Sequence, residues 1–290
     1  MTWAPGPVVT RRRLGGELKR LRLGAGLLLE DVAKKLECSP SKISRLENGK
    51  GIPRWRDVRD MLDVYAVPEG EFRERLLDWS RTGQQKMWWK EFADVLPGDT
   101  LTYVELEWDA ARVRAYESYL VHGLLQTRDY ARAVLHTVYG DSLPPRQIER
   151  LVEVRMRRQE VLGPDHGLAF CAVVDESTLY REVGSAEVLA AQLRHLVGAA
   201  GSPRLELRVL PFSAGLVPAS RGAFAKLDFS DGLEHGLVHL ERPGGVSEFL
   251  AEPGEVGPYE ARLEALLEAA LPERDSVPLI ERALGRLTSV

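Results

Sequence analysis

Cysteine is scarce in this 290-residue chain, and long apolar runs are missing from it. The two cysteines, Cys38 and Cys171, are too few and too far apart for a disulfide framework or a cysteine-based zinc site. No apolar run approaches the roughly 18 residues that span a membrane, and the first residues lack the pattern of a secretory signal. These absences predict a cytoplasmic protein with no membrane partner.

Motifs of common enzymes are missing too. The sequence has no Gly-x-Ser-x-Gly elbow, no Gly-x-x-x-x-Gly-Lys phosphate loop and no His-Glu-x-x-His pair. His235 and His239 are four residues apart with Glu241 nearby, a spacing that suits a metal site on a helix, but the surrounding glycines favour a hairpin. Asp175 and Glu176 could form an acid pair, but they are explained more simply as acids favoured at a helix start. We therefore expect no enzyme, no cofactor and no metal ion.

Positive charge is outnumbered over the whole chain, which has a formal net charge of −4. It is concentrated at one end, because residues 1–56 hold 13 Lys and Arg against 5 Asp and Glu, a charge of +8 that leaves −12 for the remainder. Affinity for nucleic acid depends on the local field and on phosphate contacts, so the acidic total does not exclude it. The first 56 residues are the place to look for such a site.

Residues 39–49 have the features of one complete short helix. Ser39 is a good N-cap. Pro40 suits the first helical position, because a backbone N–H at that position has no partner within the helix and its absence costs nothing. Gly49 supplies the left-handed residue that ends the helix. Ile43 and Leu46 share one face. The opposite face carries polar side chains: Ser41, Lys42 and Arg45.

Residues 14–36 supply the packing that so short a helix needs. Leucines at 14, 18 and 21 have helical spacing, glycines at 24 and 26 break the helix, and a second periodic set follows at 29–36. Helix, break, helix, tight turn, helix is the layout of a helix-turn-helix domain, whose second helix enters the major groove of DNA. With helices near 58–65 and 71–80, we expect an all-α five-helix domain at 14–80, after a flexible basic arm at 1–13 and before a linker at 81–87.

These segments resemble the phage-repressor-like (xenobiotic response element) helix-turn-helix family, above all at 39–49, and also at 18–22, 25–27 and 31–33. The resemblance implies a structural ion pair between Arg22 and Glu47. It implies base contacts from Pro40, Ser41 and Arg45. It implies phosphate contacts from Lys42, Asn48, Lys50 and Arg54.

Two positions depart from that family. Leu28 and Leu29 replace the usual polar cap and glutamine that open the second helix. Glu37 stands in the turn before the third helix, where relatives often have glycine. A non-glycine residue at positive φ costs on the order of 1 kcal/mol, so this turn should be slightly strained.

The remainder of the chain, residues 88–290, predicts an α+β domain with a mostly antiparallel sheet. Short β-rich runs at 168–174, 205–210, 223–229, 236–241 and 246–250 predict its strands. Leu106, Ala110, Val113 and Tyr116 continue one helical period and predict a single long helix. Further helices are expected at 128–139, 147–162, 186–197, 259–270 and 276–287. Tryptophans at 88, 89 and 108 are interpreted as packing rather than as a ligand pocket.

Several segments of this part resemble the C-terminal domain of actinobacterial WhiJ-like, antitoxin-like (Scr-family) transcriptional regulators. They are residues 103–107, 119–131, 155–160, 175–176, 192–193, 209–212 and 222–224. The Gly-Leu-Leu-Gln-Thr sequence at 123–127 is the most specific of them, although His122 and Arg128 replace prolines that are common in relatives. The resemblance implies transcriptional regulation, often beside a gene for a small protein that this domain binds.

The sequence thus predicts a sequence-specific regulator that binds double-stranded DNA. One short helix reads few base pairs, so a homodimer on two half-sites is expected. The C-terminal domain would bind a small protein encoded by a neighbouring gene or an unidentified small molecule. The alternative is an antitoxin-like interaction protein that binds a small partner, with DNA binding limited to autoregulation.

Overall fold

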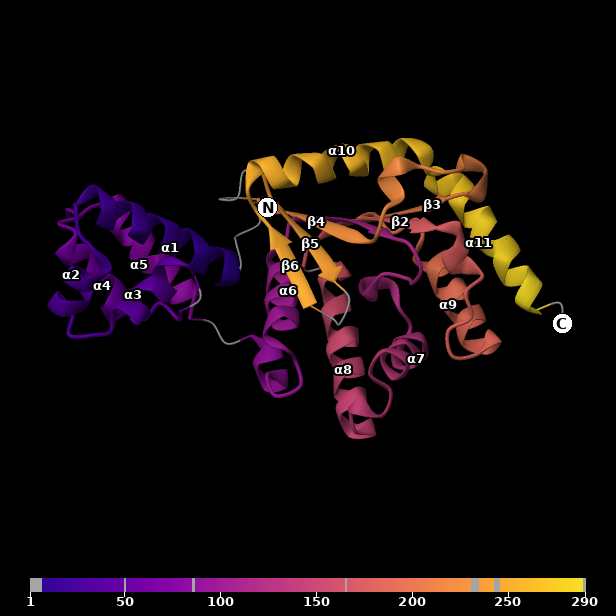
Figure 1. Cartoon of the computed structure of the whole chain (residues 1–290), viewed down its shortest axis with the longest axis horizontal. Helices are drawn as coiled ribbons and strands as arrows, with labels where there is room; N and C mark the ends of the chain where they lie inside the picture. The colour runs from indigo at the N-terminus through magenta and orange to yellow at the C-terminus, as the bar shows by residue number, and fades with distance from the viewer. Residues whose placement is uncertain are drawn as a thin grey trace. The chain divides into compact units, whose positions relative to one another are not determined.

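The computed structural model of the chain describes residues 7–49, 51–84, 87–164, 166–230, 235–242 and 246–288. It contains two compact units, one formed mainly by residues up to Trp88 and the other mainly by residues from Trp89 onward (Figure 1). Within the described residues there are eleven α-helices, five of them in the first unit, and six strands. None of these helices combines the length and the apolar character that crossing a membrane demands.

The first unit is a bundle of five helices around one core. They are α1 (Pro7–Gly24), α2 (Leu29–Lys35), α3 (Pro40–Glu47), α4 (Trp55–Val64) and α5 (Glu71–Thr82). Each contributes apolar side chains at helical spacing, and together these bury a continuous cluster. Its central members are Leu14, Leu18, Val32, Ile43, Val58, Met61, Leu62 and Leu76. The helical N-terminal region expected from the sequence is therefore present.

The flexible arm expected at 1–13 is wrong for its second half. Helix α1 begins at Pro7, so residues 7–13 form its first two turns, while residues 1–6 lie outside the described part of the chain. Arg11 donates from its guanidinium to the carbonyl of Gly83, at 3.3 Å, and so ties this end of α1 to the end of α5. A basic run with few apolar residues forms ordered helix here because contacts distant in the sequence hold it.

The second unit is built on six strands and six further α-helices among its described residues. The strands are β1 (Arg112–Glu117), β2 (Ala169–Asp175), β3 (Leu205–Leu210), β4 (Phe224–Asp228), β5 (Leu237–Arg242) and β6 (Val246–Leu250). The helices are α6 (Gly98–Asp109), α7 (Arg128–Tyr139), α8 (Pro145–Arg158), α9 (Ala186–Ala199), α10 (Pro253–Ala269) and α11 (Glu273–Thr288). Short 3₁₀ turns include η2 (Gly123–Leu125), η5 (Glu176–Leu179) and η6 (Phe212–Ala214).

These strands form one mixed sheet in the order β3-β2-β1-β4-β5-β6. Strand β1 pairs parallel with β2, and β2 pairs parallel with β3. The other three pairings, β1 with β4, β4 with β5 and β5 with β6, are antiparallel. The sheet is therefore mostly antiparallel, but three neighbouring strands end at the same edge. Parallel pairs need long crossovers, which α7 with α8 and then α9 provide.

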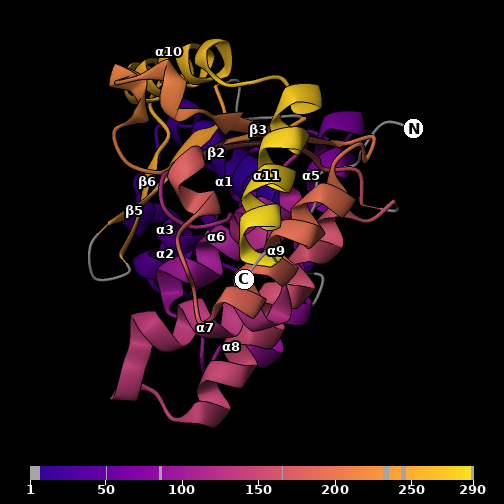
Figure 2. The same ribbon diagram turned by 90° about the vertical axis from the view of Figure 1, so that its right-hand side faces the viewer.

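Helices cover both faces of this sheet. Helix α10 lies along one face, and α6 to α9 lie on the other, as Figure 1 shows. Side chains of α10 such as Leu263 and Leu266 pack with Tyr116, Val173 and Phe224 of the strands. Helix α11 packs on α9 and β3, which Figure 2 shows from the side. Since β2 is covered on both faces, its sequence is a nearly continuous apolar run rather than an alternating one.

Strand β1 corrects the single long helix that was predicted through Val113 and Tyr116. Helix α6 ends at Asp109, and Ala110 leaves it with an extended backbone at φ −70° and ψ 139°. Residues 112–117 then form the central strand of the sheet, between β2 and β4. The apolar residues in this stretch fit both a helical and an alternating pattern. Pairing with strands on both sides decides in favour of the strand.

Candidate nucleic-acid interface

Helix α3 has both of its ends fixed by local chemistry. Ser39 lies outside the helix, and its hydroxyl accepts a hydrogen bond from the backbone N–H of Lys42 at 3.2 Å. At the other end Gly49 adopts φ +67°, and a Cβ there would lie 2.8 Å from the Cα atom of Arg12. Ile43 and Leu46 are buried in the core of the first unit. These contacts define which face of α3 points to solvent.

Arg22 and Glu47 form a bidentate ion pair behind α3. Arg22 Nε donates to Glu47 Oε1 at 2.7 Å, and Nη2 donates to Oε2 at 2.9 Å. A third donor of Arg22, Nη1, reaches the carbonyl of Leu27 at 2.8 Å. The hydrogen bond to Glu47 raises the pKa of Arg22 above its ordinary value. The pair therefore joins the end of α1, the following turn and the end of α3.

The turns before and after α2 contain the two positions that depart from the helix-turn-helix family, at Leu28 and at Glu37. Glu37 adopts φ 50°, so the chain does place a non-glycine residue in the left-handed region. Leu28 occupies the N-cap position of α2 with no side-chain cap, but its backbone N–H donates to Asp31 Oδ2 at 2.9 Å. One half of a capping box is thus kept without a polar residue at the cap.

The exposed side of α3 carries the expected base-contact residues. Pro40 and Ser41 lie exposed in its first turn, and Arg45 lies one turn further along. Within the described residues no carboxylate pairs with Arg45. A hollow of about 210 Å³ lies over this side of the helix, lined in part by Ser41, Lys42, Arg45 and Ile52. The hollow presents one guanidinium, one ammonium group and two serine hydroxyls beside two apolar side chains.

The four expected phosphate-contact residues lie in different situations. Lys42 forms an ion pair with Asp57 of α4, with Nζ 2.8 Å from Oδ1. Asn48 turns its amide back onto the helix and donates to the carbonyl of Ser44 at 2.8 Å. Arg54 is exposed at the N-cap position of α4. Lys50 lies outside the described residues.

Sequence reasoning missed the partnership of Lys42 with Asp57. The two residues are 15 positions apart in different helices, and no local spacing rule connects them. Asp57 lies in the first turn of α4, where an acid is favourable in any helix, so its position indicated nothing about Lys42. Its carboxylate reduces the positive potential of the exposed side of α3 and holds Lys42 in place.

In the second unit, buried polar contacts involve four of the segments singled out in the sequence: 103–107, 119–131, 155–160 and 192–193. Arg158 of α8 forms a bidentate pair with Glu107 of α6, with both N–H···O distances at 2.8 Å. Burial alone would raise the pKa of Glu107, but the Arg158 guanidinium lowers it below its usual value. The Arg158 guanidinium also lies 5.2 Å from the ring centroid of Tyr103. Residues from α6 and α8 are thereby joined.

The loop at 121–127 is held by a further set of polar contacts. Gln126 donates to the carbonyl of Val121 at 2.7 Å and accepts from Arg155 at 2.8 Å. Gln192 of α9 donates to the carbonyl of Leu125 at 2.7 Å and accepts from the N–H of Thr127 at 2.8 Å. His122 Nδ1 accepts from the N–H of Leu124 at 3.2 Å. These contacts explain the polar residues of the segment as supports of its backbone.

The remaining sequence interpretations concern His239, the acid pair and the tryptophans. His239 lies on β5, stacked on Tyr103 with ring centroids 4.0 Å apart, and Nε2 is 3.0 Å from the hydroxyl of Ser247. Asp175 is the N-cap residue of η5 and accepts from the N–H of Ser177 at 2.9 Å, as expected for an acid at a helix start. Trp89 is buried and packs edge-on against Trp108, at 5.8 Å between ring centroids.

Two known domain families match the chain. A helix-turn-helix domain matches residues 13–76, which contain α2, α3 and α4. A domain of unknown function (DUF5753) matches residues 100–282, from within α6 into α11. Comparison with curated proteins and with solved structures found no match. The first match supports a DNA-binding regulator, and because the second spans more than half of the chain, the protein belongs to the DUF5753 family, with a helix-turn-helix domain in its N-terminal part.

Proposed function

We propose that the protein is a sequence-specific transcriptional regulator that binds double-stranded DNA as a homodimer, and that it acts by binding rather than as an enzyme. The observation that carries this proposal is the exposed side of α3. That helix is capped at Ser39, anchored by Ile43 and Leu46, and braced by the buried Arg22–Glu47 pair. A recognition helix needs such rigid support, because base contacts require side chains to be placed before binding.

The residues of α3 divide by the contacts they would make. Arg45 can donate two hydrogen bonds to the O6 and N7 atoms of guanine, and Ser41 can contact either kind of base pair. Pro40 would lie against the base edges at the start of the helix. Lys42, Asn48, Lys50 and Arg54 would contact phosphates, which position the protein without reading sequence. One α3 helix spans too few base pairs for a specific site, so two half-sites about one helical turn apart are expected.

The test is selection of bound sequences from random duplex DNA with the full chain at fixed salt. The expected result is an inverted repeat. Arg45→Ala should then cost about 1 to 3 kcal/mol on the selected site and relax base preference at one position of each half-site. Arg75→Ala, which removes an exposed arginine from α5, is the matched control and should leave the preference unchanged.

Full specificity in Arg45→Ala would mean that α3 is not the recognition helix. A selection that returns no motif would contradict sequence-specific binding altogether.

We assign regulation to the second unit. The resemblance to WhiJ-like regulators supports a small protein from a neighbouring gene as its partner, with an unidentified small molecule as the other possibility. Adding such a protein during the selection should change the affinity or the motif. If the partner binds the chain but leaves the DNA affinity and the motif unchanged, partner binding does not control DNA binding.

A further inference from the structure

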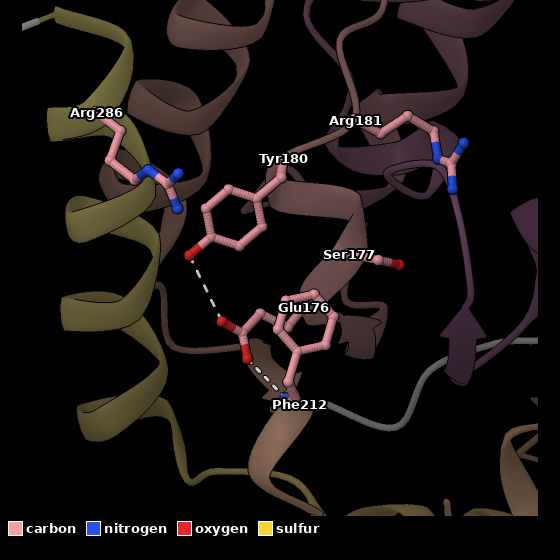
Figure 3. Close-up of a pocket in the computed structure, with 6 residues that line it drawn as sticks. All are labelled: Glu176, Ser177, Tyr180, Arg181, Phe212 and Arg286. Carbon is pink, nitrogen blue, oxygen red and sulfur yellow. Dashed lines mark hydrogen bonds between the residues drawn. The ribbon is translucent and has the colours of Figure 1, made fainter. Parts of the chain in front are cut away.

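A hollow of about 630 Å³ lies at the carboxyl ends of β2 and β3 in the second unit, away from the polar contacts described above. Figure 3 shows its lining. Residues of η5 and the following turn form one wall, the start of η6 forms a second, and α11 forms a third. The lining residues are Glu176, Ser177, Tyr180, Arg181, Phe212 and Arg286. In sheets with parallel strands, the carboxyl ends of those strands are where binding sites usually lie.

The apolar part of this hollow is exposed to solvent. Phe212 is 61% exposed and Tyr180 37%. Their rings are nearly parallel, with centroids 6.1 Å apart and planes at 21°. Leu216, four residues beyond Phe212 on the same loop, is 92% exposed. Exposed aromatic and aliphatic residues that gather in one place on a folded unit mark interaction surfaces.

The one acid of the hollow holds it together. Glu176 is buried, and its Oε2 accepts from the backbone N–H of Phe212 at 2.6 Å. The Tyr180 hydroxyl lies 3.5 Å from Oε1 of the same carboxylate, as the dashed lines in Figure 3 mark. Both oxygens are therefore directed at the two aromatic residues. This carboxylate positions the rings and is not free to attract a cation.

The charges that face solvent here are positive. The guanidinium of Arg286 reaches the Tyr180 ring from α11, 5.2 Å from its centroid, and Arg181 extends on the other side (Figure 3). The lining therefore has two cations and one anion. This is unusual for residues 89–290, which hold 21 Lys and Arg against 31 Asp and Glu. A positive apolar surface in an acidic unit favours a ligand that is both negative and apolar.

The openness of the hollow indicates the size of that ligand. Small-molecule sites usually enclose most of the ligand surface, whereas this one is bordered by aromatic residues that point into solvent. Tyr and Arg, with Phe, are the residue types that dominate binding energy between proteins. We propose that the hollow between η5, η6 and α11 is a docking site for an acidic segment of a partner protein, with an apolar side chain of that segment against Tyr180 and Phe212. This proposal rests on the partner binding assigned above to the second unit and does not depend on DNA binding by the first.

The proposal can be tested with a displayed library of random peptides and the immobilised full chain. Selected peptides should share an aromatic or large aliphatic residue flanked by Asp or Glu. Phe212→Ser and Arg286→Glu should each weaken their binding by at least about tenfold. Tyr119→Ser is the matched control, because Tyr119 is 52% exposed and lies outside this lining. Circular dichroism should be unchanged in all three variants, since the altered side chains are on the surface.

Charge reversal sharpens the test. A second selection on Arg286→Glu should return peptides enriched in Lys or Arg. The proposal is overturned if no consensus emerges, if the unaltered chain selects basic peptides, or if Phe212→Ser and Tyr119→Ser have equal effects. It is also overturned if sedimentation shows that Phe212→Ser converts a dimer to a monomer, because the occupant is then a second copy of the chain. Loss of DNA affinity in Arg286→Glu, with no peptide selected, would assign the arginines to phosphate instead.

Discussion

Removing the side chain of Glu47 should destabilise two helices, α1 and α3, because its partner Arg22 lies in α1. Its side chain is 3% exposed and that of Arg22 8%, so Glu47→Leu would leave a guanidinium buried without its carboxylate. Breaking one side of a buried pair costs about 3 to 5 kcal/mol. We expect that loss in the amide hydrogen exchange of α1 and α3, measured in the full chain.

The double variant Arg22→Met with Glu47→Leu is the control for that prediction. Replacing both charges removes the uncompensated ion, so the double variant should be more stable than Glu47→Leu alone. Equal exchange rates in the two variants would show that the pair contributes nothing specific.

Asp57 should limit how strongly the protein binds any DNA. It pairs with Lys42 at 2.8 Å, and both side chains are partly exposed, so the pair itself adds little stability. Asp57→Asn would free the ammonium group for a phosphate. We expect tighter binding to all duplex sequences and a salt dependence steeper by up to about one released counterion.

Binding to specific and random duplexes over a range of salt concentrations measures this effect. Lys42→Ala with Asp57→Asn should lose the gain. If Asp57→Asn raises the affinity for the specific duplex only, Lys42 contacts a base and not a phosphate.

At the scale of the element, α3 depends on its caps more than the longer helices do. With eight residues it has few internal hydrogen bonds to lose, and Ser39 satisfies one of its first free N–H groups. Ser39→Ala should cost about 1 kcal/mol, and Ser39→Gly only a few tenths.

Hydrogen exchange in α3 should report that difference. DNA affinity should fall in Ser39→Ala while base preference stays the same, because the cap shapes the helix without reading a base. A changed preference would instead place the Ser39 hydroxyl against a base.

Strand β1 and helix α3 show why some elements are predictable from local sequence and others are not. Every signal that defines α3 lies within eleven residues, from the cap at Ser39 to Gly49. The signals that define β1 lie elsewhere. Val113 pairs with Phe170 on one side and with Leu227 on the other, so its partners are more than fifty residues away. The prediction of a helix was wrong because helical periodicity describes only neighbouring residues and carries no information about partners on other strands.

At the scale of the whole molecule, buried and half-buried ionisable groups of the second unit should set an optimum pH for stability. Burial lowers the pKa of both His122 and His239 from 6.5 to about 4. The unfolded chain then binds more protons than the folded chain between these values, so stability falls as the pH drops below 6.5. Burial, with the Glu241 carboxylate nearby, raises the pKa of Glu117 from 4.5 to about 8. At this acid the folded chain binds more protons than the unfolded chain. Its effect on stability is therefore opposite to that of the histidines, and stability falls as the pH rises towards 8.

Below pH 6.5 the two histidines change the stability with pH more than the one glutamate does, so stability rises with pH there. Above pH 6.5 only the glutamate of these three groups still changes the stability. We therefore expect the unfolding temperature of the second unit to be highest near pH 6.5 and to fall on both sides. Calorimetry of the full chain near pH 4.5, 6.5 and 8 measures it. Glu117→Gln should remove the alkaline decline and leave the acid one. A profile that rises steadily to pH 8 would contradict the raised pKa of Glu117.

The candidate interface was largely readable from sequence, because its residues lie close together along the chain. Ser41, Lys42 and Arg45 were expected on the outer side of α3, and the structure places them there. The engagement of Lys42 by Asp57 and of Asn48 by Ser44 was not foreseen. The docking hollow was not foreseen either, since Tyr180, Phe212 and Arg286 come from three separate segments.

The sequence by itself determined the helix-turn-helix, the position of α3 within it and the concentration of basic charge around it. Caps, helical periodicity and a left-handed glycine act between neighbours, so they are present in the chain before it folds. Only the tertiary structure decided that residues 7–13 are helical and that 112–117 form the central strand. It also paired Glu107 with Arg158 and brought Gln192 onto the backbone of the 121–127 loop. Those outcomes depend on pairing and burial between distant segments, which no local pattern encodes.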